Sequence, residues 1–245
     1  MTGEQGFNTI EHFISHSGGA LLVDKPRDWT SFDVVKKVRG SLRVKKVGHA
    51  GTLDPLATGL LILCSMSMTK RIDAFQALPK TYEGSMKLGA VTASYDAATP
   101  EENVCAVPPL RLEELQAAAN HFTGTVSQLP PMFSAVKVEG KRLYTLARKG
   151  MEVERTPREV HIATFHITRV ELPEVAFKIE CSKGTYVRSL VHDLGQHLGC
   201  GAYLSNLRRT AIGAFHVDEA WALDDIVHAA ARPKQPHEGV PGGAV

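Results

Sequence analysis

Asp54 is the residue of this chain best placed to carry out chemistry, because it is a single carboxylate on a tightly shaped loop. Residues 48–59, GHAGTLDPLATG, contain three glycines and one proline, which are typical of loops. A carboxylate can act as a nucleophile without a metal, and with an ordinary pKa of about 3.9 it is ionised at neutral pH. An aspartate in such a loop is more often a turn residue that bonds its own backbone. Catalysis by Asp54 therefore needs support from other residues.

The cation and the aromatic groups that such a carboxylate would need occur elsewhere in the chain. Arg188 lies in KGTYVR, residues 183–188, at an expected strand-to-helix junction, and could hold the carboxylate in place. Tyr82 and Tyr186 could stack on a base, an interaction worth about 1–3 kcal/mol per base. His49 could contact a base or a phosphate. Each has a plainer alternative: a surface arginine, a core aromatic or a polar loop residue.

Metal and phosphate-loop chemistry find little support in the sequence. No second acid lies at metal-ligand spacing from Asp54, and no Gly-x-x-x-x-Gly-Lys-Ser/Thr loop occurs. The eleven histidines form neither an H-x-H nor an H-E-x-x-H pattern. The four cysteines are far apart, which favours free thiols in a reducing cytoplasm. Metal-assisted hydrolysis and nucleotide binding are therefore both weakly supported.

A run of positive charge leads directly into the Asp54 loop. Six bases and no acid fall within eleven residues: Lys36, Lys37, Arg39, Arg43, Lys45 and Lys46. Such a run is often a solvated helix face, but its position beside the Asp54 loop favours a phosphate-contacting surface, with contacts expected from Lys36, Lys37, Lys45 and Lys46. More bases recur at residues 137–149 and 208–209, whereas acids gather at 96–102 and 218–225. A net charge of +2 can therefore hide a strongly basic face.

Length and composition are those of a globular protein. The 245 residues can form one large domain or two small ones, and 43% hydrophobic with 22% charged residues is ordinary for that class. The first residues lack the basic and apolar regions of a signal peptide. No apolar run approaches the roughly 20 residues that span a bilayer. We expect a cytoplasmic protein without membrane contact.

Hydrophobic periodicity predicts strands and helices that do not alternate strictly, which favours the α+β class. Strands are expected at residues 20–23, 60–64, 81–88, 159–170, 174–181 and 203–215, and helices at 30–42, 110–122, 141–149, 186–198 and 222–231. In the first helix, Phe32, Val35 and Val38 are spaced for one apolar face, and Thr30 or Ser31 is suited to the N-cap.

The ends of the chain are expected to lie outside the fold. We predict a flexible leader at residues 1–18, a catalytic domain at 19–231 and a disordered, Pro- and Gly-rich tail at 232–245. Within the domain, residues 96–109 are acidic and are expected to form a surface loop. Thr185 is expected to cap the helix that follows it.

Six short segments point to one family when they are taken together. They are residues 22–26 (LVDKP), 48–59 (GHAGTLDPLATG), 80–82 (KTY), 128–137 (QLPPMFSAVK), 184–188 (GTYVR) and 207–210 (LRRT). With these segments in this order over about residues 20–215, the chain resembles the bacterial TruB-type tRNA pseudouridine synthases. Any one segment could arise by chance, but six in order make coincidence implausible.

This resemblance implies the pseudouridine synthase fold, a mixed, mainly antiparallel sheet flanked by helices and loops. It implies isomerisation of the T-loop uridine of tRNA without a cofactor or metal. Asp54 falls on the family's catalytic aspartate, Tyr82 on the tyrosine that stacks on the uracil, and Arg188 on the arginine paired with the aspartate. Substrate contacts are implied for His49, Tyr186 and Leu207, and Lys25 is grouped with them because it lies in a strand-end motif near the site.

The mechanism and the partners are left partly open. Asp54 could attack C1′ of the ribose, attack C6 of the uracil or remove a ribose proton. Many family members continue into a PUA-type RNA-binding domain, which we do not expect to be complete here. We expect a monomer that binds the T-arm of tRNA and needs no protein partner.

Two alternative functions remain. One is an RNA-binding or RNA-folding module without essential catalysis, which the intact set of Asp54, Tyr82 and Arg188 disfavours. The other is a related synthase that acts on other RNA, including guide-dependent eukaryotic and archaeal enzymes. The missing second domain and the bacterial-looking motif spacing disfavour it.

Overall fold

The computed structural model describes residues 7–134, 137–138, 141–143, 151 and 153–231, and one large twisted sheet forms its centre. Ten strands of these residues belong to it, eight of them in the order β14-β1-β3-β12-β4-β11-β10-β7, while β13 pairs with β12 and β2 with β3. Most pairs are antiparallel; β1–β14 and β12–β3 are parallel. The expected α+β fold with a mixed, mainly antiparallel sheet is confirmed.

The strands of the large sheet are β1 (Ala20–Lys25), β2 (Val47–His49), β3 (Thr58–Ser65), β4 (Lys80–Leu88), β7 (Gly124–Gln128), β10 (Arg158–Glu171), β11 (Glu174–Cys181), β12 (Ala202–Ile212), β13 (Phe215–His216) and β14 (Trp221–Ala222). Two short hairpins lie apart from it: β5 (Val91–Thr92) with β6 (Glu101–Glu102), and β8 (Lys137–Val138) with β9 (Lys141–Arg142). The helices are α1 (Ile10–Ile14), α2 (Ser31–Ser41), α3 (Ile72–Ala77), α4 (Leu112–Asn120), α6 (Val187–His197) and α7 (Leu223–Ala231), with 3₁₀ turns at Met66–Arg71 and Val217–Glu219.

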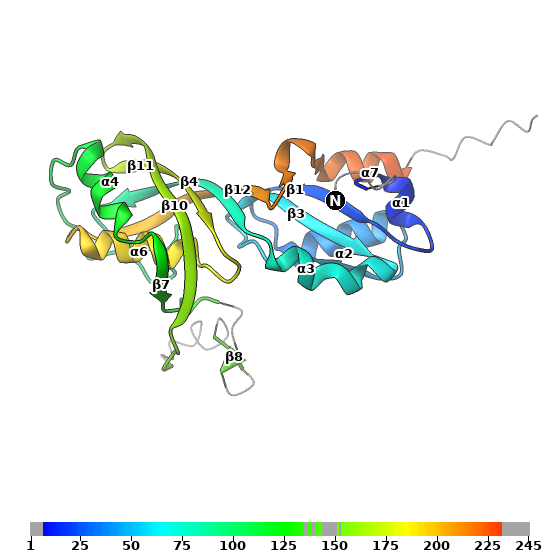
Figure 1. Ribbon diagram of the computed structural model, residues 1–245, viewed down its shortest axis with the longest axis horizontal. Coiled ribbons are helices and arrows are strands. Elements are labelled where there is room, and N and C mark those ends of the chain that lie inside the picture. The colour runs from blue at the N-terminus through cyan, green and yellow to red at the C-terminus, as the bar shows by residue number, and fades with distance from the viewer. Residues whose placement is uncertain (1–6, 135–136, 139–140, 144–150, 152, 232–245) are drawn as a thin grey trace, which may run out of the picture.

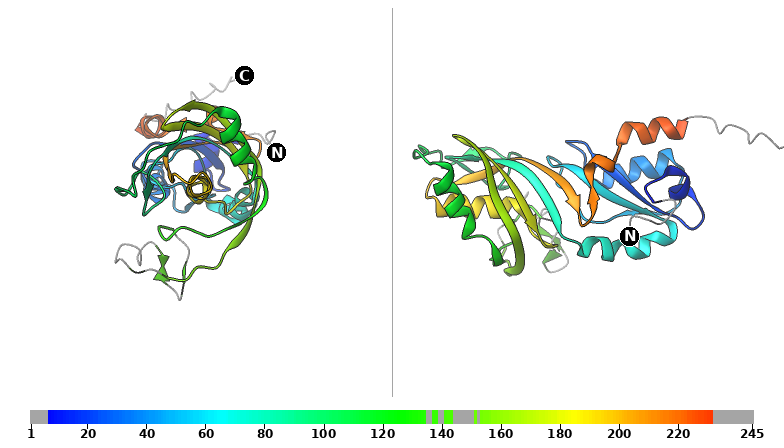
Figure 2. Two further views of the ribbon diagram at one scale, coloured as in Figure 1. Left: turned by 90° about the vertical axis from the view of Figure 1, so that its left-hand side faces the viewer. Right: turned by 45° about the horizontal axis from the view of Figure 1, so that its top comes forward.

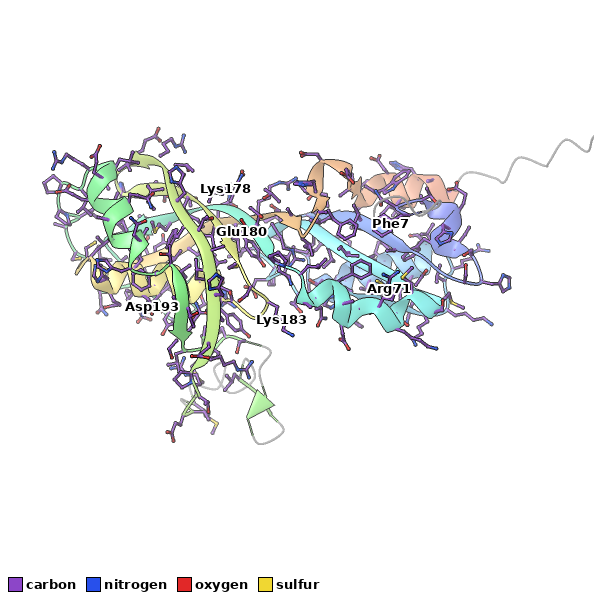
Figure 3. All side chains as sticks on the ribbon, viewed as in Figure 1. Phe7, Arg71, Lys178, Glu180, Lys183 and Asp193 are labelled. Atoms are coloured by element: carbon purple, nitrogen blue, oxygen red, sulfur yellow. The ribbon has the colours of Figure 1, made fainter. Side chains whose placement is uncertain are left out.

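The molecule is elongated and consists of two lobes that share the sheet (Figure 1). The first lobe holds β1, β3 and helices α1, α2, α3 and α7, whereas the second holds β10, β11, β7, α4 and α6. In Figure 3, Phe7 and Arg71 mark the first lobe and Asp193 marks the second. Strands β4 and β12 run through the region between the lobes (Figure 1). Viewed end-on, the strands of the second lobe curve around α6 (Figure 2, left).

The first lobe buries both faces of its sheet. Alternate residues of β1 and β3 enter two separate clusters, one with Leu61 and Leu63 beneath α2 and α7, the other with Leu60 and Ile62 beside Phe75 of α3. Neighbouring side chains of a strand point to opposite faces, so a strand covered on both faces needs an unbroken apolar sequence. This explains the run from residue 60 to 64 that follows the Asp54 loop.

Several sequence expectations are corrected at this level. The leader is not flexible throughout, because α1 lies within it and buries Phe13 completely beneath β1. Phe32 is not on the apolar face of α2 but is 68% exposed, since the helix buries Ser31, Val34, Val35 and Val38. Thr30, one of the two candidates, is the N-cap of α2 and forms a capping box with Asp33.

Other differences concern loops and helix ends. Thr185 does not cap α6; its hydroxyl donates to the Ser182 carbonyl, and α6 begins after Tyr186. The acidic stretch from residue 96 is not all surface loop, because Asp96 is buried and Glu101–Glu102 form β6. A helix was expected at 141–149, but the first two residues of that range form strand β9. Most of the other residues of the range lie outside the described part of the chain, as does the tail at 232–245.

Candidate active site

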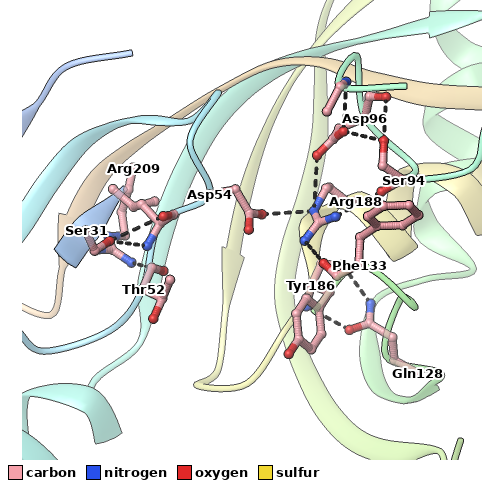
Figure 4. Close-up of polar contacts among 12 residues, drawn as sticks. Ser31, Thr52, Asp54, Ser94, Asp96, Gln128, Phe133, Tyr186, Arg188 and Arg209 are labelled. Atoms are coloured by element: carbon pink, nitrogen blue, oxygen red, sulfur yellow. Dashed lines mark hydrogen bonds and ion pairs between the residues drawn. The ribbon is translucent and has the colours of Figure 1, made fainter. Parts of the chain in front are cut away.

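Asp54 lies on the loop between β2 and β3, and buried side chains from three other elements hold that loop by its backbone. Ser31, the first residue of α2, accepts a bond from the Leu53 N–H at 2.9 Å and donates to the Leu53 carbonyl at 3.3 Å. Arg209 of β12 donates to the carbonyls of Gly51 at 3.1 Å and Thr52 at 3.4 Å (Figure 4). The residues on the N-terminal side of Asp54 are therefore fixed from two directions.

Lys25, at the end of β1, fixes the other side of the same loop. Its side chain is fully buried, and its Nζ donates to the carbonyls of Pro26 at 2.8 Å, Trp29 at 2.6 Å and Pro55 at 3.2 Å. Burial lowers the pKa of Lys25 to about 8, although the charge of Asp54 opposes the shift. These carbonyls engage the ammonium group, so substrate contact by Lys25 stays a prediction. It supports the backbone next to Asp54.

Gly59 ends the loop at a point of very close backbone approach. Its φ is +102°, a region that favours glycine. A Cβ at this position would lie 2.3 Å from the Arg209 carbonyl oxygen. A side chain here would therefore push β3 away from β12, the strand that carries Arg209 and closes the sheet beneath Asp54.

Arg188 reaches Asp54 from the opposite lobe. It is the second residue of α6, is 3% exposed, and places Nε 2.9 Å from Oδ2 of Asp54. Its Nη1 donates to the Ser94 carbonyl at 2.9 Å and its Nη2 to the Phe133 carbonyl at 3.0 Å (Figure 4). A guanidinium fixed by two carbonyls presents its remaining edge in one orientation. The structure thus brings together Asp54 and Arg188, the carboxylate and the cation that the sequence analysis paired.

Asp96 is a second carboxylate beside the same guanidinium, and sequence reasoning missed it. Its Oδ2 lies 3.5 Å from Arg188 Nε, and its Oδ1 accepts bonds from the Ser94 hydroxyl at 2.6 Å and the Ala98 N–H at 3.0 Å. Tyr95 stacks on His192 of α6 with ring centroids 3.8 Å apart, which docks this loop on the helix. No sequence pattern relates Asp96 to Arg188. The one available signal for Asp96 was its position as an acid among small and hydroxyl-bearing residues.

The carboxyl of Asp54 has a raised pKa and remains accessible. The protein atoms packed around it raise the pKa, the Arg188 guanidinium opposes that shift, and the charge of Asp96 reinforces it. The side chain still exposes 41% of its surface, so a substrate can reach it. The arrangement is suited to a carboxylate that is held in place by a cation and acts directly on a bound molecule.

Four other predicted residues lie around this centre. Tyr82 of β4 and Leu207 of β12 are buried in one apolar cluster with Leu53, the neighbour of Asp54. Burial raises the pKa of Tyr82, so its hydroxyl is protonated at neutral pH. His49 ends β2, and burial lowers its pKa, which keeps the imidazole neutral. Tyr186 precedes Arg188, and both its backbone N–H and its carbonyl bond the Gln128 amide at 2.8 and 3.0 Å.

The lysines predicted to contact phosphates lie outside this centre, on α2 and the segment that follows it. Lys36, Lys37, Lys45 and Lys46 are all exposed, and within the described residues none forms an ion pair. Arg209, in contrast, is 1% exposed and does not belong to any basic surface. Among the described residues, no three His, Cys, Asp or Glu side chains are grouped as metal ligands.

Family comparison identifies this arrangement. Residues 39–187 match the profile of the "TruB family pseudouridylate synthase (N terminal domain)", and residues 188–239 match the "tRNA pseudouridylate synthase B C-terminal domain". The first match alone contains Asp54, Tyr82 and Asp96 and spans more than half of the chain. The chain belongs to the TruB family. The resemblance drawn from six sequence segments is therefore confirmed, and so is the enzyme class, because TruB proteins are pseudouridylate synthases, which are isomerases.

Individual TruB relatives extend over most of the chain. The tRNA pseudouridine synthase B of Opitutus terrae is 50% identical over 208 residues, 85% of this chain and 86% of that protein. The one from Chloroherpeton thalassium is 46% identical over 230 residues, 92% of this chain and 95% of that protein. Each of these relatives therefore matches most of this chain over most of its own length.

Solved structures give the same TruB-type fold. A Cbf5-Nop10-Gar1 complex matches with a TM-score of 0.69 and 30% identity over 92% of this chain and 59% of that chain. The archaeal box H/ACA sRNP Nop10-Cbf5 complex matches with a TM-score of 0.66 and 27% identity over 91% of this chain and 56% of that chain. This chain therefore spans somewhat more than half the length of those proteins. Within its described residues, no helix is both long and apolar enough to cross a membrane.

Proposed function

We propose that this protein isomerises the T-loop uridine of tRNA to pseudouridine, with Asp54 as the catalytic carboxylate. The observation that carries the proposal is the ion pair between Asp54 Oδ2 and Arg188 Nε at 2.9 Å, beside a buried tyrosine. The curated relatives that are 46–50% identical are named as tRNA enzymes. The solved Cbf5 complexes, one of them described as a box H/ACA sRNP, are more distant, at 27–30% identity, so tRNA is the favoured substrate.

The substrate uridine must first leave its stack, at a cost of a few kcal/mol. In the proposed complex, Tyr82 stacks on the uracil, and Leu207 occupies part of the space beside it. His49 and Tyr186 contact the flipped nucleotide. Lys36, Lys37, Lys45 and Lys46 bind phosphates of the tRNA. Each of these roles predicts a separate defect. Loss of a substrate contact should raise KM for tRNA, whereas removal of the Asp54 carboxylate should abolish turnover.

The chemical step exchanges one bond to the ribose for another. The N1–C1′ bond breaks, the uracil turns, a C5–C1′ bond forms, and the proton on C5 is lost while N1 gains one, so atoms and electrons balance. Asp54 serves by attacking C1′ or C6 or by removing a ribose proton. Arg188 holds the carboxylate, and the enclosed site stabilises the charge that develops on the uracil. Because Tyr82 keeps its proton at neutral pH, it acts as a donor or relay.

The test is release of tritium from a tRNA transcript that carries C5-tritiated uridine. We expect multiple turnovers by the purified protein alone, which runs as a monomer in size-exclusion chromatography, and loss of release when the T-loop target uridine is replaced by cytidine. Cytoplasmic tRNA would be its substrate in the cell. Release no greater than one equivalent per protein would favour an RNA-folding module. Release from other RNA but not from tRNA would favour a different substrate.

A further inference from the structure

A surface hollow of about 690 Å³ lies along α2, outside the group of residues around Asp54. It is lined by Asp28, Trp29, Asp33, Lys36, Lys37, Gly40 and Ser41. Helix α2 belongs to the first lobe (Figure 1) and packs on β3, the strand that follows the Asp54 loop. The hollow therefore extends along the same lobe that supplies the carboxylate.

One end of this hollow adjoins the Asp54 loop. The N–H of Asp28, in its lining, donates to the carbonyl of Pro55 at 2.8 Å, and Pro55 follows Asp54 directly. Ser31, the first residue of α2, is bonded to Leu53 on the other side of Asp54. From this junction α2 runs away for eleven residues, about 16 Å at 1.5 Å per residue. The hollow and the Asp54 loop are therefore joined directly through Asp28 and Pro55.

The charge along the hollow fits a polyanion. Lys36 and Lys37 line it, and exposed Arg39, Arg43, Lys45 and Lys46 follow within the next nine residues. The carboxylate of Asp33 is engaged by the N–H and hydroxyl of Thr30 at 3.1 and 2.5 Å. The remaining acid, Asp28, lies at the end nearest the Asp54 loop and 4.0 Å from Arg27. The part of the hollow farther from Asp54 is therefore positive, and within the described residues no acid forms an ion pair with its lysines.

Gly40 lies in the lining of this hollow, next to open space. A Cβ built on Gly40 would meet no atom within 4 Å, so packing within the protein does not require glycine here. Its φ is not in the left-handed region, so the backbone does not require it either. Glycine weakens a helix relative to alanine, and one use of such a residue is to let another backbone approach closely.

We propose that this hollow binds the sugar-phosphate backbone of the substrate RNA beside the reactive uridine. Lys36 and Lys37 contact its phosphates, and Gly40 is the point of closest approach. The inference rests on the proposed function for its RNA substrate, but it adds a defined path for the strand. It also assigns Lys36 and Lys37 to one stretch of that strand, whereas Lys45 and Lys46 are not among the residues that line the hollow.

The first experiment measures binding of a tRNA transcript between 50 and 200 mM salt. Each phosphate contact removed lowers the slope of log K against log salt by about 0.7–0.9, so Lys36→Ala with Lys37→Ala should lower it by about 1.5 and weaken binding about tenfold at the lower salt. The charge-matched control is Arg169→Ala with Lys178→Ala, two exposed cations of the second lobe. It should keep the wild-type slope. Equal slopes for the two double variants and the wild type would overturn the proposal.

The second experiment uses Gly40→Ala, which changes no charge. A methyl group in the hollow should raise KM for tRNA several-fold, while the melting temperature stays the same or rises, because alanine favours the helix. A variant that is at least as stable and has unchanged KM would overturn the close approach at Gly40. A raised KM together with a lowered melting temperature would also overturn it, because the defect would then be one of folding.

The same assays separate this proposal from the proposed function. If the wild type turns over tRNA and the hollow variants bind tRNA normally, RNA binding by the hollow is excluded and the enzyme assignment stands. If the hollow variants weaken tight, salt-dependent tRNA binding but the wild type forms no pseudouridine, RNA binding by the hollow stands and the enzyme assignment is excluded.

Discussion

The Nε atom of Arg188 lies 2.9 Å from Oδ2 of Asp54, and this ion pair joins the two lobes of the molecule. Asp54 comes from the β2–β3 loop of the first lobe, and Arg188 from the start of α6 in the second (Figures 1 and 4). Each partner is fixed within its own lobe, Arg188 by carbonyls of Ser94 and Phe133. The geometry of the carboxylate therefore depends on the strands β4 and β12 that hold the lobes together.

Asp54→Asn should abolish pseudouridine formation without loss of the fold. The amide is neither a nucleophile nor a base, and removal of a catalytic nucleophile commonly lowers kcat by more than about 10⁴-fold. Arg188 would keep its carbonyl partners and Asp96. Because burial disfavours the ionised carboxylate, its replacement by a neutral group should not lower the melting temperature. Tritium release and a thermal melt measure the two effects; appreciable turnover by this variant would exclude Asp54 as the catalyst.

Acidification should stop turnover at a pH above the ordinary titration of aspartate, about 3.9. The pKa of Asp54 is raised by burial, so the ionised form is lost earlier as pH falls. The same shift means that the folded state binds this proton more tightly than the unfolded state. Protonation of Asp54 therefore favours folding, and the loss of activity should precede any unfolding. Profiles of kcat/KM and circular dichroism against pH check this; activity that is constant down to pH 4 would contradict it.

Arg188→Lys should impair catalysis more than it impairs folding. A lysine can keep a positive charge near Asp54, but it cannot also donate to the carbonyls of Ser94 and Phe133 in the planar geometry of a guanidinium. We expect a fall in kcat of at least about 10²-fold, or 2.7 kcal/mol, and a stability loss of about 1–2 kcal/mol from the orphaned carbonyls. Turnover measured well below the melting temperature, with urea unfolding in parallel, separates the two. Near-normal kcat in a destabilised protein would contradict the role of Arg188.

The sequence could predict elements whose signal is local. Thr30 lies directly before an amphipathic segment, and the apolar run after Asp54 belongs to a strand covered on both faces. The sequence was less informative about which face of α2 is buried. That face includes Val34 rather than Phe32, and Trp29 packs into the same cluster. No local pattern distinguishes these two alternatives.

Charges buried by distant partners could not be predicted. Asp96 was expected at the surface and is buried because Arg188 lies beside it, and Arg209 was counted with the exposed bases but donates to the carbonyls of Leu60, Gly51 and Thr52. In each case the partner is far away along the chain, and the sheet brings the two together. Composition and spacing contain no record of such a contact. The family resemblance located Asp54, Tyr82 and Arg188, but not the groups that hold them.

Lys25→Met should destabilise the protein and lower kcat more than it raises KM. The methionine keeps the apolar stem but leaves carbonyls of Pro26, Trp29 and Pro55 without the donor that Lys25 supplies. An unsatisfied buried polar group costs about 1–3 kcal/mol, so we expect a loss of about 3 kcal/mol in urea unfolding. Lys70→Met, at an exposed position, is the control. If KM rises and kcat stays normal, Lys25 binds substrate and does not support the loop.

Gly59→Ala should destabilise the protein far more than Gly124→Ala, although both glycines have positive φ, +102° and +83°. At Gly124 a Cβ meets nothing within 4 Å, so alanine adds backbone strain alone, about 1–2 kcal/mol. At Gly59 the Cβ would lie 2.3 Å from the carbonyl oxygen and 2.8 Å from the nitrogen of Arg209, and neither can move without separating β3 from β12. We expect an additional loss of at least about 2 kcal/mol and a fall in kcat, because Arg209 also holds Gly51 and Thr52. Urea unfolding of the two variants with turnover at a temperature where both are folded gives the comparison; equal losses of stability would mean that β3 and β12 can separate freely at this point.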